Sequence, residues 1–267
     1  MTQFINDRIR KAVRARYSQV ARTGDSGCGC SSSCCQPAGT DAKTVSRELG
    51  YSAIDIELVP GGANMGLGCG NPRAIASLKQ GETVLDLGSG GGFDCFLASK
   101  EVGETGRVIG VDMTPEMVEK SRTSAGEAGY QNVDFRLGEI EHLPVADDTV
   151  DVIISNCVIN LSPDKEQVFR EAFRVLKPGG RLAVSDIVAT AELPEEQKND
   201  LDLLTGCMAG ASLISALEAM LVAAGFESVS IKPKDESREF LKTWAPGSRV
   251  EDYVVSAAIE AVKPGSK

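Results

Sequence analysis

Residues 84–94 restrict the possible folds of this chain more than any other segment. The apolar run Val84-Leu-Asp-Leu leads directly into Gly88-Ser-Gly-Gly-Gly-Phe, and a helical pattern follows. A buried strand that turns through glycines into a helix is typical of nucleotide-binding α/β folds, because glycine lets the backbone approach a ligand closely. The segment therefore predicts a cofactor crevice at the end of a central strand.

Strand and helix patterns alternate on both sides of this turn. Strands are predicted at 83–87, 107–111, 133–137, 150–155 and 180–186, and helices at 93–99, 115–128 and 165–176, the last ending at Pro178-Gly179-Gly180. Such alternation indicates an α/β fold with a mostly parallel, doubly wound sheet that is covered by helices on both faces. Beyond residue 186, the patterns predict helices at 194–207 and 213–224 and strands at 229–232 and 253–262.

The patterns divide the chain into three parts. Residues 1–60 form an N-terminal arm with predicted helices at 5–20 and 41–49, residues 61–190 the core, and residues 191–267 an α+β extension. Between the two helices of the arm lies a Gly- and Ser-rich stretch, which is typical of a loop. Its cysteines are Cys28, Cys30, Cys34 and Cys35.

Charge and cysteine content exclude some classes of function. The net charge of −10 leaves no basic stripe to neutralise phosphates, so a nucleic-acid partner is not expected. The chain shows no apolar run of transmembrane length and no signal-peptide core, which predicts a soluble, cytoplasmic protein without a membrane partner. In that compartment, eight cysteines favour catalysis, redox exchange or soft-metal binding over a static disulfide framework.

Polar residues at the ends of several predicted strands predict how a cofactor is held. Asp112 ends the second strand, where a carboxylate can bind ribose hydroxyls, and an acidic loop at 138–141 follows the third. A dinucleotide site and a purely structural turn are the alternatives, although G-x-G-x-x-G spacing is met only loosely. The expected cofactor-binding residues are Asp86, Gly88, Ser89, Gly90, Asp112, Met113, Glu139, Ile140 and Asn156.

Three further cysteines lie far apart in the sequence. Cys69 is in a glycine-rich loop at 60–72 without apolar periodicity, so a packing role is not expected for it. Cys157 follows a central strand, at the sheet edge where ligands bind in α/β folds. Cys207 lies in an interrupted helical stretch. Taken singly, each of these three cysteines fits a structural role about as well as a functional one. Cys95, in the helix after the glycine turn, is instead expected to pack as a small apolar residue.

Together these motifs resemble two nested families. Residues 81–189 resemble the class I S-adenosylmethionine-dependent methyltransferases in the glycine turn, Asp112, the 138–141 loop and the strand at 151–156. Most of the chain resembles the arsenite methyltransferases, through Arg16-Tyr17-Ser18, Gly66-Leu-Gly-Cys-Gly-Asn-Pro, Ile154-Ser-Asn-Cys-Val-Ile-Asn-Leu and Gly206-Cys-Met-Ala-Gly-Ala. The resemblance implies a Rossmann-like fold and S-adenosylmethionine as cofactor.

The resemblance also implies a substrate and its ligands. Arsenite, or its glutathione or other thiol conjugates, would be methylated for detoxification while bound as As(III) to Cys69, Cys157 and Cys207, the implied catalytic residues. An N-terminal cysteine would pair with Cys69 during turnover, and thioredoxin or glutathione would then reduce the pair. Cys28, Cys30, Cys34 and Cys35 are equal candidates for this redox role.

Three alternatives stay open at this point, together with the number of methyl groups added. The chain could methylate a quinone-like small organic acceptor, which predicts an apolar pocket and indifference to substitution of Cys157 and Cys207. It could be a non-enzymatic protein that binds arsenic or a metal through its thiols. The arm cysteines could bind zinc, although their spacing lacks the usual two pairs.

Overall fold

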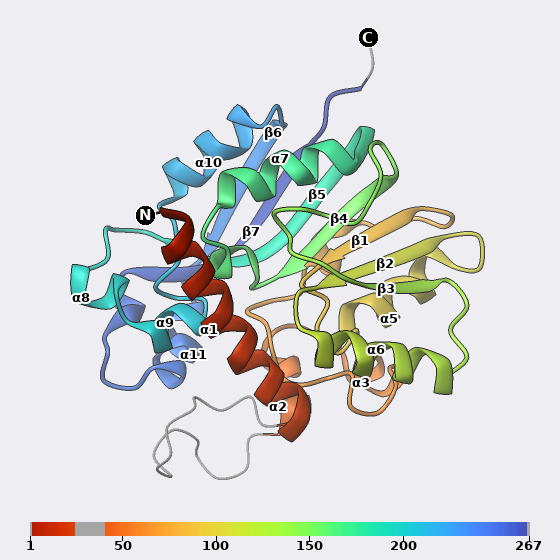
Figure 1. Cartoon of the computed structure of the whole chain (residues 1–267), viewed down its shortest axis with the longest axis horizontal. Helices are drawn as coiled ribbons and strands as arrows, with labels where there is room; N and C mark the ends of the chain where they lie inside the picture. Colours follow the sequence, from red (N-terminus) through yellow and green to blue (C-terminus); the bar gives the residue numbers. More distant parts are fainter. Residues whose placement is uncertain (1, 25–40, 266–267) are drawn as a thin grey trace.

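A seven-stranded sheet organises the computed structural model, which describes residues 2–24 and 41–265 (Figure 1). The strand order is β3-β2-β1-β4-β5-β7-β6. Neighbouring strands from β3 to β5 are parallel, and β7 runs antiparallel to both β5 and β6. The strands are β1 (Thr83–Leu87), β2 (Arg107–Asp112), β3 (Val133–Leu137), β4 (Val150–Asn156), β5 (Leu176–Ala189), β6 (Glu227–Lys234) and β7 (Val254–Val262). The predicted mostly parallel, Rossmann-like sheet is confirmed.

Local signals explain where several helices begin. Pro115 occupies the first turn of α6, where its missing N–H costs nothing, and the Asp41 carboxylate accepts a hydrogen bond from Thr44 N–H at the start of α2. The helices are α1 (Thr2–Thr23), α2 (Ala42–Glu48), α3 (Ala53–Leu58), α4 (Arg73–Ala76), α5 (Phe93–Val102), α6 (Pro115–Glu127), α7 (Lys165–Val175), α8 (Glu195–Lys198), α9 (Leu201–Thr205), α10 (Ile214–Ala223) and α11 (Ser237–Trp244), with short 3-10 helices η1 (Ile159–Leu161) and η2 (Val250–Asp252).

Alternation along the strands builds a core on each face of the sheet. Leu85 and Leu87 of β1 pack in one cluster with residues of α7 and α10. Val84, which points the other way, packs in a second cluster with residues of α4, α5 and α6. Helices cover both faces of the sheet. A site can therefore form at the carboxyl ends of the parallel strands.

Two predicted elements are wrong in detail. The helix predicted at 194–207 is divided into α8 and α9, because Asp200 accepts hydrogen bonds from Asp202 N–H and Leu203 N–H and starts a new helix. The strand predicted at 180–186 starts earlier, because residues 176–179 also belong to β5, whose start pairs with β4 through an irregular register. Gly179 N–H also donates to Lys263 C=O at 2.9 Å.

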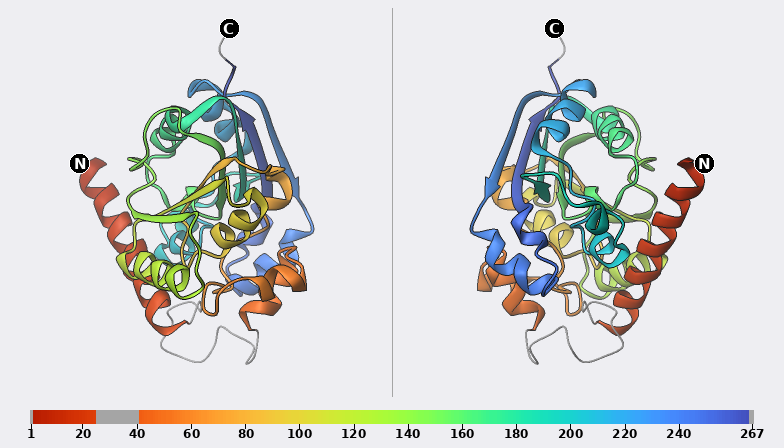
Figure 2. Two further views of the ribbon diagram at one scale, coloured as in Figure 1. Left: turned by 90° about the vertical axis from the view of Figure 1, so that its right-hand side faces the viewer. Right: turned by 90° about the vertical axis from the view of Figure 1, so that its left-hand side faces the viewer.

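The parts flanking the core pack on it closely. β6 and β7 continue the same sheet beyond β5, and α1 lies along one outer side of the molecule, against α6 and α9 (Figure 2). The division at residues 60 and 190 stays a prediction. Among the helices of residues 2–24 and 41–265, none is long and apolar enough to span a membrane.

Candidate active site

The glycine turn after β1 is fixed on one side and open on the other. Gly88 and Gly90 have φ of 69° and 50°, in the left-handed region that favours glycine. The N–H groups of Gly88 and Ser89 both donate to Val111 C=O, at 2.8 and 3.0 Å. A Cβ at Gly88 would lie 2.5 Å from the Val158 side chain, whereas a Cβ at Gly90 would meet no atom within 4 Å.

Carboxylates from two strands surround this turn. Asp112 accepts hydrogen bonds from Gly90 N–H at 2.9 Å and Thr114 N–H at 2.8 Å, so it holds the turn in shape. Asp86 is buried and accepts a hydrogen bond from the Cys95 thiol at 3.2 Å. Burial raises the pKa of both carboxyls, and for Asp86 nearby carboxylates raise it further. The predicted packing of Cys95 is confirmed by its complete burial.

The residues at the turn fit a polar cofactor. The Ser89 hydroxyl is buried, and no group of the described residues forms a hydrogen bond with it. A buried hydroxyl without a partner is costly, and a ligand in the open space beside Gly90 would remove that cost. S-adenosylmethionine carries hydroxyl, amino and carboxylate groups that can bind such a hydroxyl.

The loop after β3 faces α1. Glu139 forms ion pairs with Arg14 at 3.1 Å and with Arg10 at 3.5 Å, and both arginines belong to α1. Ile140 is buried in the main core cluster, and Met113 packs at the edge of the cluster that contains the thiols. Cofactor binding by these three predicted residues stays a prediction, and α1 covers the loop that carries two of them.

The three distant cysteines meet in one buried cluster. Cys69, Cys157 and Cys207 are 2%, 6% and 3% exposed and pack among the same apolar side chains, so the expectation that Cys69 would not pack is wrong. The Cys207 thiol donates to Cys157 C=O at 2.7 Å. The sulfur atoms of Cys69 and Cys157 lie within 4.8 Å of each other and of an Asp186 carboxylate oxygen. All three cysteines are free thiols.

Burial disfavours the thiolate form of Cys69 and Cys157. It raises the pKa of Cys69, and it raises the pKa of Cys157 well above its usual value, with hydrogen bonds to the other two thiols acting in the same direction. Burial likewise raises the pKa of Tyr17 in α1, beside Cys207. The Tyr17 hydroxyl donates to Thr205 C=O at 3.4 Å. A buried cluster of sulfur ligands suits a soft electrophile that exchanges its oxygen ligands for sulfur.

Sequence reasoning missed the polar residues that support the thiols. Asp186 accepts hydrogen bonds from Ile159 N–H at 2.9 Å, Ile187 N–H at 2.8 Å and Asn160 Nδ2 at 3.0 Å. Burial raises the pKa of Asp186 to about 6, although the Lys165 ammonium acts in the opposite direction. The available signal was an aspartate at the carboxyl end of a predicted strand, the same signal that selected Asp112.

Asn156 is the predicted cofactor residue whose surroundings differ most from expectation. Its side chain binds the loop that carries Cys69, because Asn156 Oδ1 accepts a hydrogen bond from Cys69 N–H at 2.9 Å. Binding of the cofactor by Asn156 stays a prediction. The redox candidates Cys28, Cys30, Cys34 and Cys35 lie outside the described residues.

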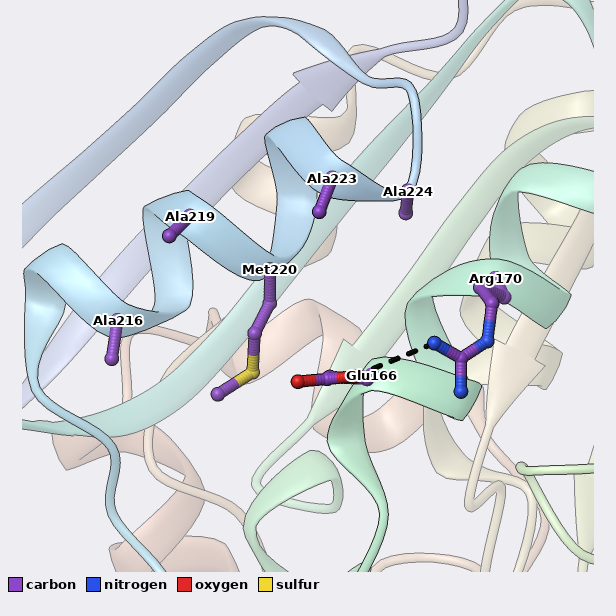
Figure 3. A pocket seen from close by; sticks show the side chains of 7 residues that line it. All are labelled: Glu166, Arg170, Ala216, Ala219, Met220, Ala223 and Ala224. Carbon is purple, nitrogen blue, oxygen red and sulfur yellow. Dashed lines mark hydrogen bonds and ion pairs between the residues drawn. The ribbon is translucent and has the colours of Figure 1, made fainter.

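A surface groove lies away from this site. It runs between α7 and α10, where Glu166 and Arg170 of α7 lie across from Met220 and the alanines around it (Figure 3). The two charged side chains form an ion pair at 3.5 Å. None of the candidate thiol or cofactor residues lines this groove.

Comparisons with known proteins identify the family of this chain. A family model described as a methyltransferase domain matches residues 78–235. An arsenite methyltransferase from Halobacterium salinarum is 54% identical over 265 residues, which is 97% of this chain and 67% of that protein. An arsenite methyltransferase from Mus musculus is 37% identical over 229 residues, or 82% of this chain and 58% of the mouse protein. This chain is thus matched to only part of the length of either relative.

A solved structure gives the same result. The crystal structure of an arsenic(III) S-adenosylmethionine methyltransferase from Chlamydomonas reinhardtii superposes with a TM-score of 0.62 and 32% identity, covering 85% of this chain and 75% of that one. The predicted family is therefore confirmed by the sequence relatives, the family model and the fold. The chain belongs to the arsenite methyltransferase family, within the class I methyltransferases.

Proposed function

We propose that this chain transfers a methyl group from S-adenosylmethionine to trivalent arsenic held by Cys69, Cys157 and Cys207. The observation that carries the proposal is the meeting of three buried thiols at the end of β4, the strand that pairs with β1 and its glycine turn. Gly88 of the turn lies against Val158, the residue that follows Cys157. A cofactor at the turn and an arsenic atom among the thiols would therefore be neighbours.

The thiols match the chemistry of arsenite. Trivalent arsenic is soft and prefers sulfur ligands to carboxylates or imidazole. Each sulfur–arsenic bond forms as the thiol hydrogen leaves with an arsenic-bound hydroxide as water, so neutral thiols are the correct starting state. Three sulfur ligands form a pyramid that leaves the arsenic lone pair at its apex as the nucleophile.

Residues at the ends of β1, β2 and β3 would hold the methyl donor. When bound there, S-adenosylmethionine supplies a methyl group on a positively charged sulfur. Asp112 and Ser89 would bind its polar groups, and the open side of Gly90 would leave room for it. Because arsenic has no proton to lose, the chain needs no general base, and its contribution is to hold the two reactants close together.

Each methylation must be followed by a reduction. The new arsenic–carbon bond uses the arsenic lone pair and raises arsenic formally from the trivalent to the pentavalent state. Two electrons return when two thiols form a disulfide, and thioredoxin or glutathione would reduce it in turn. Any of Cys28, Cys30, Cys34 and Cys35 would serve as partner of Cys69 in this step. The cytoplasm, where thiols are kept reduced, suits such a cycle.

A methyl-transfer assay tests the proposal. Purified full-length chain is incubated with arsenite, glutathione and methyl-labelled S-adenosylmethionine, and the products are separated. We expect labelled methylarsenicals from the wild type and none from Cys157→Ser. Binding of S-adenosylhomocysteine without any methylarsenical, combined with labelling of a quinone-like acceptor, would instead assign an organic substrate. Failure to bind S-adenosylhomocysteine would leave a thiol-based arsenic-binding protein.

A further inference from the structure

Two asparagines flank Cys157, and each reaches the backbone of a different cysteine. Asn156 immediately precedes Cys157, and Asn160 follows it in η1. The Asn156 side chain bonds to the loop of Cys69, and the Asn160 side chain bonds to the backbone of Cys207. The segment 156–160 therefore contacts both of the other thiol-bearing segments.

Asn156 binds the backbone on both sides of the Cys69 side chain. Its Oδ1 accepts the Cys69 N–H at 2.9 Å, and its Nδ2 donates to Gly70 C=O at 2.8 Å. The approach is as close as the loop permits, because a Cβ at Gly68 would lie 2.6 Å from Asn156 Nδ2. Gly68 also has a φ of +116°, which disfavours any side chain there.

Buried neighbours determine which way the Asn156 amide faces. Its Nδ2 lies 3.1 Å from the Tyr51 hydroxyl and 3.5 Å from Asp94 Oδ2. The Tyr51 hydroxyl donates to Asp94 Oδ1 at 2.7 Å, so its oxygen is free to accept from the amide. A carboxylate beside the amide requires the NH2 group on that side, which leaves Oδ1 facing Cys69 N–H.

Asn160 has the same relation to Cys207. It is 4% exposed, and its Nδ2 lies within hydrogen-bond distance of Ile187 C=O at 2.6 Å, Asp186 Oδ1 at 3.0 Å and Cys207 C=O at 3.3 Å. The segment after Cys207 packs directly on it, because a Cβ at Gly210 would lie 2.1 Å from the Asn160 carbonyl oxygen. This amide therefore joins the Cys207 segment to the end of β5.

We propose that Asn156 and Asn160 are positioning residues of the arsenic site, Asn156 for Cys69 and Asn160 for Cys207. The inference rests on the proposed function. Neither amide needs to touch arsenic, because each acts through the backbone of one ligand. Residues that orient ligands in this way typically change the affinity of the site by about 10- to 100-fold when they are removed.

Double-mutant cycles on arsenite affinity test the pairing. Asn156→Ala and Asn160→Ala are made alone and with Cys69→Ser or Cys207→Ser, and arsenite is titrated against the fluorescence of Trp244, the one tryptophan, which packs against the thiol cluster. Each alanine variant should weaken arsenite binding by about tenfold or more. Asn156→Ala should add nothing to Cys69→Ser and keep its full effect beside Cys207→Ser, and Asn160→Ala should show the reverse.

Controls separate positioning from loss of fold and from cofactor binding. The exposed Asn199→Ala should leave arsenite affinity unchanged, and Gly68→Ala, whose Cβ would displace the Asn156 amide, should reproduce Asn156→Ala. Affinity for S-adenosylhomocysteine should stay within about twofold throughout.

Two outcomes would overturn the inference. Additive effects of Asn156→Ala and Cys69→Ser would remove the pairing, and weaker S-adenosylhomocysteine binding with normal arsenite binding would make Asn156 a cofactor residue. A wild type that binds S-adenosylhomocysteine but no arsenite would overturn the proposed function itself, which is a different result from either.

Discussion

At the scale of single residues, Cys157 is the centre of the candidate site. Its backbone has a φ of 60°, and Cys207 has a φ of 66°, a region that costs a non-glycine residue about 1–2 kcal/mol. Positive φ also occurs at Ser77, Asp148, Ser228 and Arg249, but these two positions carry proposed arsenic ligands, and strain at a functional site can be maintained by the surrounding structure. The strain at Cys157 is maintained by its N–H, which donates to Ser185 C=O at 2.8 Å.

We predict that Cys157→Ser and Cys207→Ser each abolish arsenic methylation. A serine hydroxyl is a hard ligand, so arsenite loses one of its sulfur positions while the cofactor turn is untouched. Methylarsenicals are measured after separation, and S-adenosylhomocysteine affinity by calorimetry. Arsenite affinity is compared in the same variants. Cys95→Ala, which removes a buried thiol outside the cluster, is the control for that affinity. Full turnover of either serine variant would contradict the prediction.

Gly90→Ala should weaken cofactor binding selectively. The added Cβ meets no protein atom within 4 Å, so it can clash only with a ligand in that space. The positive φ adds a backbone strain of about 1 kcal/mol, and a loss of cofactor affinity larger than this reports on the bound ligand. We expect S-adenosylhomocysteine affinity to fall about tenfold, equivalent to about 1.4 kcal/mol. Gly126→Ala in α6, where the Cβ also meets open space, is the matched control. Equal affinities of the two variants would argue against a cofactor at the turn.

At the scale of elements, α1 joins the cofactor loop to the thiol-bearing extension. Arg10 pairs with Glu139 and with the buried Glu141, which also accepts a hydrogen bond from Ser162 at 2.6 Å. On its other side, Tyr17 packs at the edge of the thiol cluster. The helix therefore contacts both halves of the candidate site.

Arg10→Ala should destabilise the chain more than Arg14→Ala. The Arg10 side chain is 17% exposed and its partner Glu141 is 4% exposed, whereas the Arg14 side chain is 43% exposed. Removing Arg10 leaves a buried carboxylate with one partner fewer, so we expect a loss of about 2 kcal/mol in the free energy of unfolding. Removal of Arg14 should cost less than about 1 kcal/mol. Urea unfolding of both variants measures the difference, and equal losses would count against it.

Sequence patterns predicted the long elements and missed several short helices. The strands at 83–87 and 133–137 were predicted at their observed bounds, because apolar runs between turn signals are strong local signals. The helices α3, α4 and α11 were not predicted. Each has eight residues or fewer, too short to show a helical period, and tertiary packing rather than propensity stabilises helices of that length.

At the scale of the whole molecule, β5 is tied to the amino end of the sheet as well as to the site. Arg181 of β5 forms a two-bond ion pair with Glu82, at 2.7 and 2.9 Å, and also donates to the C=O groups of Ala76 and Ser77. Burial raises the pKa of Glu82, but the bonds to Arg181 and the hydrogen bond from Lys79 N–H together outweigh it, so the pKa is lowered from its usual value.

We predict a pH-dependent cost for Glu82→Gln. A carboxyl with a lowered folded-state pKa stabilises the fold above its unfolded pKa of about 4.3, and this stability is lost as the pH falls through the folded pKa. The variant should therefore lose about 1 kcal/mol at pH 7 and show a much smaller loss at pH 3. Chemical unfolding at the two pH values tests this, and an equal loss at both would contradict it.

The site itself could be predicted only in part. The strand-end rule identified Asp112 and Cys157 from local signals. The meeting of Cys69, Cys157 and Cys207 depended on family resemblance, because no local spacing relates residues that far apart in sequence. Asn160 was missed for the same reason, since its hydrogen bonds exist only in the folded chain. Asp186, like Asp112, ends a predicted strand, so the strand-end rule could have identified it.

X-ray absorption at the arsenic edge tests the central claim most directly. Arsenite is loaded onto the full chain in which Cys28, Cys30, Cys34 and Cys35 are serine, so that the arm offers no thiol. We predict three sulfur neighbours around arsenic in this background, and two sulfurs with one oxygen after each of Cys69→Ser, Cys157→Ser and Cys207→Ser. An arsenic site that keeps three sulfurs in Cys157→Ser, or that has none in the background itself, would contradict the account.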